Sequence, residues 1–243
     1  MSLVIPVYNS ANFIAQNIKV ILENLETQPF ESELILVNDG SRDNSLELLR
    51  EIATQHTRVR VLDCGHNQGK GHAVGYGFRE ASGKFLVFND ADLAYPPDQV
   101  LRILKALEAG NDVAIACRVL PESRFEISPA FFRYLYTRHL MGRFFNRIVR
   151  WMVLPDILDS QAGLKGFTHE AAQVIFSRQT LKRFSFDVEL LFIAQKLGLK
   201  VAQVPVNFRY FFEETTVRFA QDTLHMLRDL LKIRMNNLHG LYD

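Results

Sequence analysis

The stretch "LVFNDADLAYPPDQ", residues 86–99, places Asp90 and Asp92 one residue apart directly after an apolar run. The run predicts a buried strand, and the two prolines predict the start of a helix, because proline is favoured at the first helical position. Two carboxylates at the end of a buried strand are costly unless a cation balances them. Since carboxylate oxygens suit Mg²⁺ or Mn²⁺ held together with substrate phosphates, we interpret the pair as metal ligands; a solvated polar turn is the alternative.

The rest of the chain repeats this alternation of strand and helix. Further apolar runs that predict strands cover residues 2–7, 33–40, 58–63 and 112–117. Apolar residues recur at helical spacing between them, and residues 41–45 are expected to supply capping side chains for the second helix. The pattern predicts an α/β fold with a mainly parallel sheet and helices on both faces. No linker divides the sequence cleanly, so we expect a single domain over residues 1–243.

Polar residues gather where the predicted strands end. They are Tyr8, Asn9, Asn38, Asp39, Asn67, Gln68, Lys70, Asp90, Asp92 and Arg118. In parallel sheets the ligand crevice lies outside the carboxyl ends of the strands. We therefore expect these positions to build a binding site.

The glycine-rich stretch "HNQGKGHAVGYG", residues 66–77, is not a standard nucleotide loop. It matches neither GxxxxGK[ST] nor GxGxxG, which disfavours a P-loop NTPase and a dinucleotide enzyme. Its glycines are expected to permit tight helix packing and close approach of the backbone to a ligand, with Lys70 near a phosphate. His66 and His72 are expected to be surface or hydrogen-bonded loop histidines.

Charge separates one segment from the rest of the chain. The whole chain carries 28 basic and 27 acidic residues, which argues against a nucleic-acid-binding protein. Residues 118–154, in contrast, hold seven arginines and two glutamates, a net charge of +5. Two amphipathic helices with basic residues are predicted, either for a membrane surface or as ordinary surface helices. The first has Arg143, Arg147 and Arg150 on one face and Phe144, Ile148, Trp151 and Met152 on another; the second has Met226, Leu227, Leu230 and Leu231 opposite Arg228 and Lys232.

The two cysteines and the lengths of the apolar segments indicate the cellular compartment in which the protein works. Cys64 and Cys117 form no CxxC pair and have no histidine at metal-ligand spacing, which disfavours a zinc site or a disulfide framework. No stretch approaches the ~20 apolar residues of a membrane span, and the first residues are interpreted as a strand and not a signal peptide. We expect a reducing, cytosolic compartment.

A last group of polar residues interrupts apolar surroundings in "DSQAGLKGF", residues 159–167, and "FSFDVELLFIAQKLG", residues 184–198. Its members are Asp159, Gln161, Lys165, Asp187 and Glu189. Asp187 and Glu189 suit the start of a helix, because acidic side chains favour helix N-termini.

Taken in order, these motifs resemble family 2 glycosyltransferases of the GT-A fold. The motifs are "SLVIPVYNS", "LILVNDGSRDNS", "NQGKGHAVGYGFREASGKFLVFNDADL", "ACR", "DSQAGLKGF" and "FDVELLFIAQKLGLKVAQVPVNF". The last two, followed by "DTLHMLRDLLKIR", are most similar to dolichyl-phosphate glucosyltransferases, with polyprenyl-phosphate mannosyltransferases next. The likeness covers nearly the whole chain. It implies a nucleotide-sugar-binding half, residues 1–117, and an acceptor-binding half, residues 118–243.

The resemblance also implies roles for individual residues. Those implied to line the nucleotide-sugar site are Pro6, Val7, Tyr8, Asp39, Lys70, Asp90 and Ala91. Asp90 and Asp92 would hold Mg²⁺ or Mn²⁺ bridging the donor diphosphate, with Asp92 counted among the catalytic residues. Ser10, Ala94 and Ala162 depart from residues common in the family.

The expected reaction is metal-dependent, inverting transfer of a hexose, glucose before others, from a nucleotide sugar to a polyprenyl phosphate. Arginine grips phosphate bidentately, which selects Arg118 and Arg138, and then Arg133, for the acceptor phosphate. A hydroxyl acceptor would need Asp187 as its base. Two further hypotheses are transfer of mannose from GDP-mannose and a non-catalytic binding module. A lipid acceptor implies peripheral attachment to the cytoplasmic face of a membrane.

Overall fold

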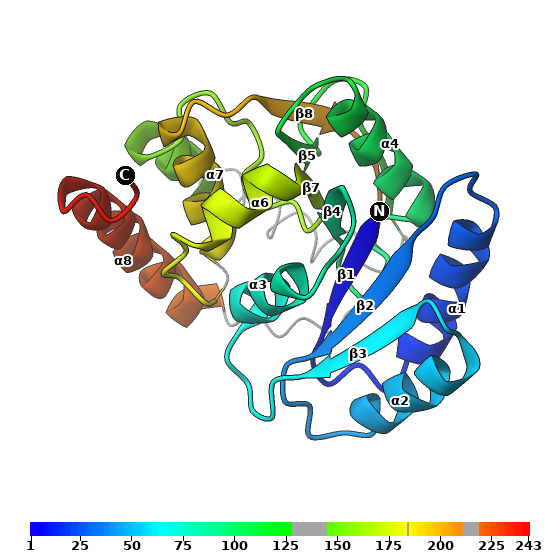
Figure 1. The fold of residues 1–243 in the computed structure, drawn as a ribbon. Coiled ribbons are helices and arrows are strands. Elements are labelled where there is room, and N and C mark those ends of the chain that lie inside the picture. The colour runs from blue at the N-terminus through cyan, green and yellow to red at the C-terminus, as the bar shows by residue number, and fades with distance from the viewer. Residues whose placement is uncertain (128–144, 184, 211–218) are drawn as a thin grey trace.

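The computed structural model describes residues 1–127, 145–183, 185–210 and 219–243. Its centre is a seven-stranded sheet in the order β3-β2-β1-β4-β7-β5-β8 (Figure 1). The strands are β1 (Ser2–Val7), β2 (Glu33–Asn38), β3 (Val59–Asp63), β4 (Phe85–Phe88), β5 (Val113–Cys117), β7 (Lys165–Thr168) and β8 (Val201–Pro205). All neighbours pair in parallel except β7, which is antiparallel to β4 and β5. The predicted α/β fold and its mainly parallel sheet are confirmed.

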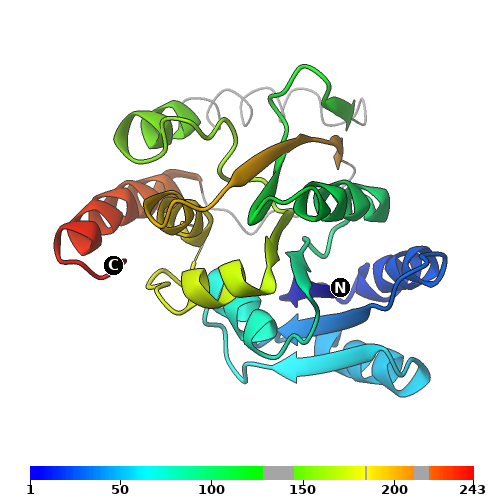
Figure 2. The ribbon, with the colours of Figure 1, turned by 45° about the horizontal axis from the view of Figure 1, so that its top comes forward.

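Helices cover both faces of this sheet (Figure 2). One apolar cluster joins one face to α1 (Ile14–Glu26), α2 (Ser45–Gln55) and α4 (Pro97–Glu108). The other joins the opposite face to α3 (Lys70–Arg79), α6 (His169–Phe176), α7 (Phe186–Lys196) and α8 (Phe219–Leu238). Successive side chains of a strand point to opposite faces, so Leu3 and Ile5 belong to the first cluster and Val4 to the second.

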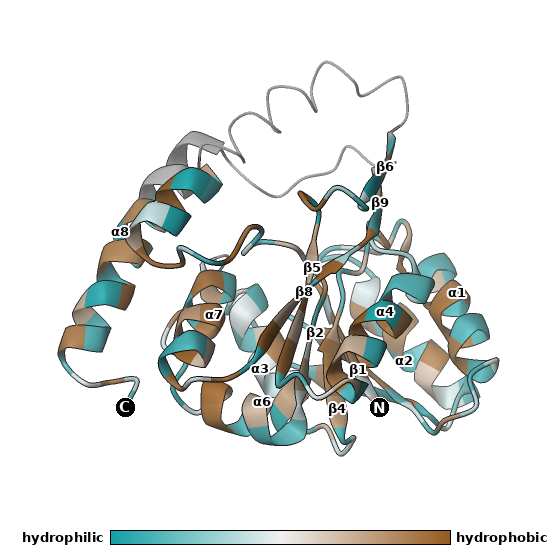
Figure 3. Ribbon diagram, turned by 90° about the horizontal axis from the view of Figure 1, so that it is seen from above, coloured by the Kyte–Doolittle hydropathy of each residue, from teal (hydrophilic) through white to brown (hydrophobic). Residues whose placement is uncertain are grey.

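A small second sheet stands at the carboxyl end of the large one. Its strands, β6 (Arg124–Ile127) and β9 (Asn207–Tyr210), pair in parallel directly beyond β8 (Figure 3). The backbone N–H of Arg209 donates to the carbonyl oxygen of Ala94 at 2.8 Å, which ties β9 to the turn after Asp92. This arrangement closes one side of the region where the central strands end.

The glycines of α3 have the packing role expected of them. A Cβ on Gly77 would lie 2.4 Å from Val4 of β1, and one on Gly71 would lie 2.6 Å from Phe186 of α7. Both distances are shorter than carbon atoms tolerate, so α3 can approach β1 and α7 only with glycine at these positions. His72 lies in this helix and not in a loop, which corrects the expectation for that residue.

Two predictions about the starts of helices are confirmed in part. The N-cap of α2 is Asn44 without a side-chain cap; instead Asp43 accepts hydrogen bonds from the N–H and hydroxyl of Ser45. Asp187 and Glu189 lie in the first turn of α7 but bind other partners. Such side chains compete for tertiary partners, which capping rules do not consider.

The two predicted amphipathic helices are confirmed in part. Arg147 and Arg150 are exposed and Ile148 is partly buried, but Trp151 is 84% exposed and does not join the apolar face. In α8, Leu230 is buried whereas Leu231 is 55% exposed. Arg143 and Phe144 lie outside the described residues. Among the helices that the structure describes, none has the length and apolarity that crossing a membrane requires.

Candidate active site

The parallel strands bring distant polar residues to one edge of the sheet. β1 lies between β2 and β4, so Tyr8, Asp39 and Asp90 follow three neighbouring strands. The N–H of Asp39 donates to the carbonyl oxygen of Val7 at 2.8 Å, and the N–H of Asn89 donates to that of Val4 at 3.1 Å. The expected site at the carboxyl ends of the strands is thereby assembled.

The turn that holds the two aspartates is shaped by its own hydrogen bonds. The N–H of Asp90 donates to the Asn89 side chain at 2.9 Å, and Asp92 accepts from the N–H of Ala94 at 2.9 Å. Leu93 adopts a φ of 55°, in the left-handed region that non-glycine residues rarely occupy. Strain of this kind persists where the surroundings impose it, often at functional sites. The turn leaves Asp90 partly exposed and Asp92 exposed.

Lys70 reaches this turn because Asp39 organises the loop before it. The carboxylate of Asp39 accepts hydrogen bonds from the N–H groups of Gln68 and Gly69, at 2.8 and 2.9 Å, and from the side chain of Asn67. Helix α3 then begins at Lys70, whose Nζ lies 2.5 Å from Asp90 Oδ1. Burial lowers the pKa of Lys70, but the nearby carboxylates, Asp90 above all, raise it by more than burial lowers it. The pKa is therefore raised, and Lys70 stays charged.

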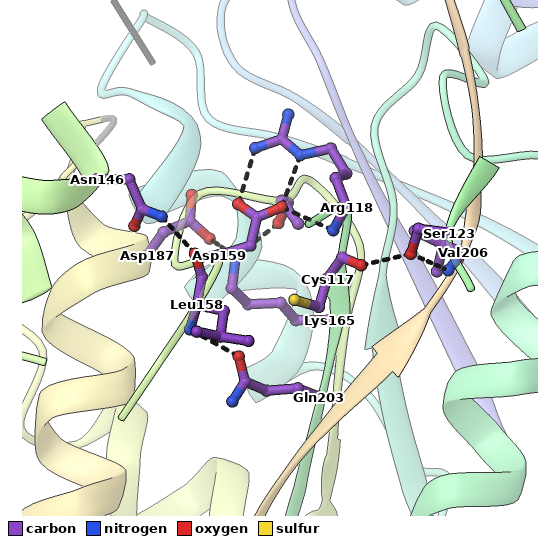
Figure 4. Close-up of polar contacts among 11 residues, drawn as sticks. Cys117, Arg118, Ser123, Asn146, Leu158, Asp159, Lys165, Asp187, Gln203 and Val206 are labelled. Atoms are coloured by element: carbon purple, nitrogen blue, oxygen red, sulfur yellow. Dashed lines mark hydrogen bonds and ion pairs between the residues drawn. The ribbon is translucent and has the colours of Figure 1, made fainter. Parts of the chain in front are cut away.

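Arg118 is held by Asp159 (Figure 4). Its Nε and Nη2 donate to the two carboxylate oxygens at 2.7 and 2.8 Å, and its backbone N–H donates to Asp159 at 3.0 Å. Burial raises the pKa of Asp159, but the guanidinium of Arg118 lowers it by more than burial raises it. The pKa of this carboxyl therefore lies below its usual range. The third guanidinium nitrogen points away from Asp159. Arg118 is therefore a fixed cation at the end of β5.

A second buried ion pair lies below the first. Lys165 of β7 places its Nζ 2.5 Å from Asp187 Oδ1 and donates to the carbonyl oxygen of Ala162 at 2.6 Å (Figure 4). Both side chains are almost completely buried. Burial raises the pKa of Asp187 and lowers that of Lys165, and the attraction between the two opposes both shifts. Asp187 is thus committed to Lys165 and poorly placed to remove a proton from an acceptor.

Three residues of this region were missed as parts of the site. Asp159 and Lys165 attracted notice only as polar interruptions, because their partners lie 41 and 22 residues away in the chain. Gly163 lies so close to Asp90 that a Cβ there would be 1.8 Å from Oδ2. The absence of a side chain at Gly163 lets the loop before β7 pack against the aspartate turn.

Tyr95 is a further residue without a sequence signal. It is 1% exposed, and its hydroxyl has no hydrogen-bond partner within the described part of the chain. Burial raises the pKa of this phenol. A buried tyrosine hydroxyl usually finds a partner, and the charges of Arg118, Asp159, Asp90 and Asp92 all act on this phenol.

The aspartate turn fits a hard divalent cation. Asp90 and Asp92 supply carboxylate oxygens, which Mg²⁺ and Mn²⁺ prefer, and waters with donor phosphates can complete the shell. Among the described charges, the carboxylates of Asp90, Asp92, Asp159 and Asp187 face the cations of Lys70, Arg118 and Lys165.

The remaining predicted residues of the nucleotide-sugar site lie at the end of β1 and in the aspartate turn. Pro6 and Tyr8 are half-buried and Val7 is buried at the end of β1; Ala91 is buried and accepts a hydrogen bond from Asn17. Their contact with a nucleotide stays a prediction. Arg133 and Arg138 lie outside the described residues. Glu189 is structural, since it accepts hydrogen bonds from Thr180, Leu181 and Tyr242.

We predict that Asp159→Asn lowers the free energy of unfolding by about 2–3 kcal/mol, because it leaves a partly buried guanidinium without its countercharge. Urea unfolding followed by circular dichroism measures this loss. Glu126→Gln is the matched control: it breaks the exposed pair with Arg209, and a loss below about 1 kcal/mol is expected. Equal effects of the two substitutions would contradict a structural role for the Arg118–Asp159 pair.

Comparison with known proteins agrees with this geometry. The family described as Glycosyl transferase family 2 matches residues 2–167. Dolichyl-phosphate beta-glucosyltransferase of Homo sapiens is 32% identical over all of this chain and 77% of its own length, and that of Dictyostelium discoideum is 29% identical over all of this chain and 76% of its length.

A solved structure shares the fold. Glucosyl-3-phosphoglycerate synthase from Mycobacterium tuberculosis, in complex with Mn²⁺, UDP-glucose and phosphoglyceric acid, superposes with a TM-score of 0.69 at 20% identity, covering 96% of this chain and 78% of that one. The GT-A fold is confirmed. The chain belongs to glycosyl transferase family 2 and is a glycosyltransferase.

Proposed function

We propose that this enzyme transfers glucose from UDP-glucose to a polyprenyl phosphate with inversion at the sugar carbon. The similarity to dolichyl-phosphate beta-glucosyltransferases over the whole chain supports this substrate pair most strongly. The complex of the related fold with Mn²⁺ and UDP-glucose supports the donor and the cation. The division into a donor half, residues 1–117, and an acceptor half, residues 118–243, is part of the proposal.

On the donor side, the chain must stabilise a leaving diphosphate. Lys70 is a charged donor at the N-terminus of α3, beside Asp90, where an anion is also favoured by the helix dipole. Mg²⁺ or Mn²⁺ bound by Asp90 and Asp92 would supply Lewis-acid stabilisation of the same charge. Asp39 would face the base or ribose, and it already holds the loop that delivers Lys70.

On the acceptor side, the buried pair of Lys165 and Asp187 favours a phosphate over a hydroxyl. A polyprenyl phosphate carries ionised oxygen at neutral pH and needs no strong base, whereas a hydroxyl acceptor requires one. Asp187 is 5% exposed and occupied by Lys165, so it is poorly suited to that task. Arg118, positioned by Asp159, would bind the acceptor phosphate together with Arg138 and Arg133.

The proposal extends to the membrane surface where such a lipid lies. Trp151, 84% exposed, stands beside the exposed Arg147 and Arg150 in the helical residues 145–152. Tryptophan and arginine together suit the headgroup region of an anionic bilayer. Peripheral binding to the cytoplasmic face follows from this proposal.

The proposed reaction is tested by the release of nucleoside diphosphate from UDP-glucose and from GDP-mannose, with Mn²⁺ or EDTA, with and without a short polyprenyl phosphate. We expect release from UDP-glucose that needs Mn²⁺ and rises with the lipid phosphate. NMR of the product should show a β-linked glucosyl phosphate. Asp92→Asn should lower turnover by roughly 10²-fold or more, because transition-state charge loses its support.

Different results would assign a different activity. Preference for GDP-mannose would make the enzyme a mannosyltransferase. Release unaffected by lipid would point to a hydroxyl acceptor, and nucleotide binding without turnover of any donor would indicate a binding module.

The roles of Asp187 are separated by two variants. Asp187→Asn alone leaves Lys165 buried without its partner, so it is expected to lose stability whatever its catalytic role. The double variant Lys165→Met with Asp187→Asn removes both charges and should recover stability and much of the turnover with a lipid phosphate. Turnover that stays abolished in a stably folded double variant would favour Asp187 as a base.

For the membrane, we predict that Trp151→Ala weakens binding to anionic vesicles by roughly fivefold to tenfold, because a large exposed apolar side chain is lost. Sedimentation with vesicles measures the affinity. Val20→Ala, on the exposed side of α1, is the matched control and should bind as the unaltered enzyme does. Unchanged binding of Trp151→Ala would exclude this helix as the contact.

A further inference from the structure

Asp39, Cys64 and His72 meet at the carboxyl ends of β2 and β3, although they belong to three segments. Asp39 follows β2, Cys64 follows β3, and His72 lies in the first turn of α3. One ligand atom of each lies within 4.8 Å of the other two, and Cys64 Sγ is 3.8 Å from His72 Nδ1. Within the described residues, this is the one cluster that joins three potential metal-binding side chains.

The separation between Cys64 Sγ and His72 Nδ1 suits a tetrahedral metal. Zinc binds sulfur at about 2.3 Å and nitrogen at about 2.0–2.1 Å, which places two such ligands roughly 3.6 Å apart in a tetrahedron. The observed 3.8 Å between Cys64 and His72 is close to that separation. Asp39 accepts three hydrogen bonds, and a carboxylate offers about four acceptor positions, so one remains for a cation.

The backbone holds the three residues in place. The N–H of Asp39 donates to Val7, and that of Cys64 donates to Asn38 at 2.9 Å. The N–H of His72 donates to the carbonyl oxygens of Gly69 and Lys182, at 3.0 and 3.2 Å. A cluster on anchored backbone needs little rearrangement to bind an ion.

The donor set differs in kind from that of the aspartate turn. Thiolate, imidazole and carboxylate together suit Zn²⁺ and similar borderline-soft cations, whereas two carboxylates suit Mg²⁺ and Mn²⁺. The Cys64 thiol would lose its proton to the solvent on binding, as cysteine ligands do.

We propose that Asp39, Cys64 and His72 form a second metal site, selective for Zn²⁺-like cations and separate from the site at Asp90 and Asp92, with water at the fourth position. The sequence argued against a zinc site because no short motif contains these three residues. The parallel sheet places Asp39, which follows β2, beside Cys64 and His72.

Occupation of this site opposes turnover. A cation at the remaining acceptor position of Asp39 occupies the place that the proposed function gives to the base or ribose of the donor. It also withdraws negative charge from the carboxylate that holds the loop before Lys70. Zn²⁺ is therefore inhibitory, and Mn²⁺ does not relieve it by competition because the two ions bind different residues. This effect on turnover rests on the proposed function; the binding of metal does not.

Titration of the whole enzyme with Co²⁺, with absorption spectra recorded, tests the binding directly. Cobalt bound to a thiolate gives an intense sulfur-to-cobalt charge-transfer band, and cobalt at the all-oxygen aspartate turn gives none. We expect the band in the unaltered enzyme, its loss in Cys64→Ser, and its displacement by one equivalent of Zn²⁺. His72→Gln should weaken Co²⁺ binding at least tenfold.

Two matched controls separate this site from its surroundings. Cys117→Ser removes the other cysteine, and His66→Gln removes an exposed histidine in the loop between β3 and α3. Both variants should keep the charge-transfer band. Zn²⁺ added at saturating Mn²⁺ should inhibit the unaltered enzyme and His66→Gln several-fold more than Cys64→Ser. No band with the unaltered enzyme, or a band that survives Cys64→Ser, would overturn the proposed site; a band without inhibition would overturn only its effect on turnover.

Discussion

Pairing of buried and partly buried charges organises the carboxyl end of the sheet. A carboxylate or an ammonium taken out of water is expensive unless an opposite charge lies beside it. Here Asp159 pairs with Arg118, Asp187 with Lys165, and Asp90 with Lys70, so each cation of the described site has its own anion. Removal of any member leaves its partner uncompensated. These contacts tie α3 to the turn after β4, α7 to β7, and the loop before β7 to the end of β5.

The same pairing divides the acidic residues into two kinds. Asp159, Asp187 and Glu189 are buried and bound to partners from other segments, which makes them parts of the scaffold. Asp92 is exposed on a turn whose next residue, Leu93, adopts a left-handed conformation. The scaffold acids hold cations in place, and the aspartate turn keeps Asp92 at the surface.

Asp39 links the donor region to the rest of the site. Its carboxylate holds the loop before Lys70, and Lys70 contacts Asp90, so the ends of β2 and β4 are connected through α3. The backbone requires glycine at Gly69, where φ is 102° and a Cβ would lie 2.5 Å from the carbonyl oxygen of Lys182. Any ligand that draws on Asp39 consequently acts on Lys70 as well. This connection joins the proposed zinc site to the catalytic edge of the sheet.

The amino-acid sequence by itself determined the alternation of strands and helices, the parallel sheet and the edge at which polar residues gather, because hydrophobic periodicity is a local property. It also determined the family, since its motifs occur in a characteristic order along the chain. Only the tertiary structure decided which charges pair: Arg118 meets Asp159 across 41 residues, and Lys165 meets Asp187 across 22. It likewise decided that Trp151 faces solvent and that Cys64, His72 and Asp39 meet. The physical reason is that side-chain partners depend on the order and direction of strands, which no short stretch of sequence contains.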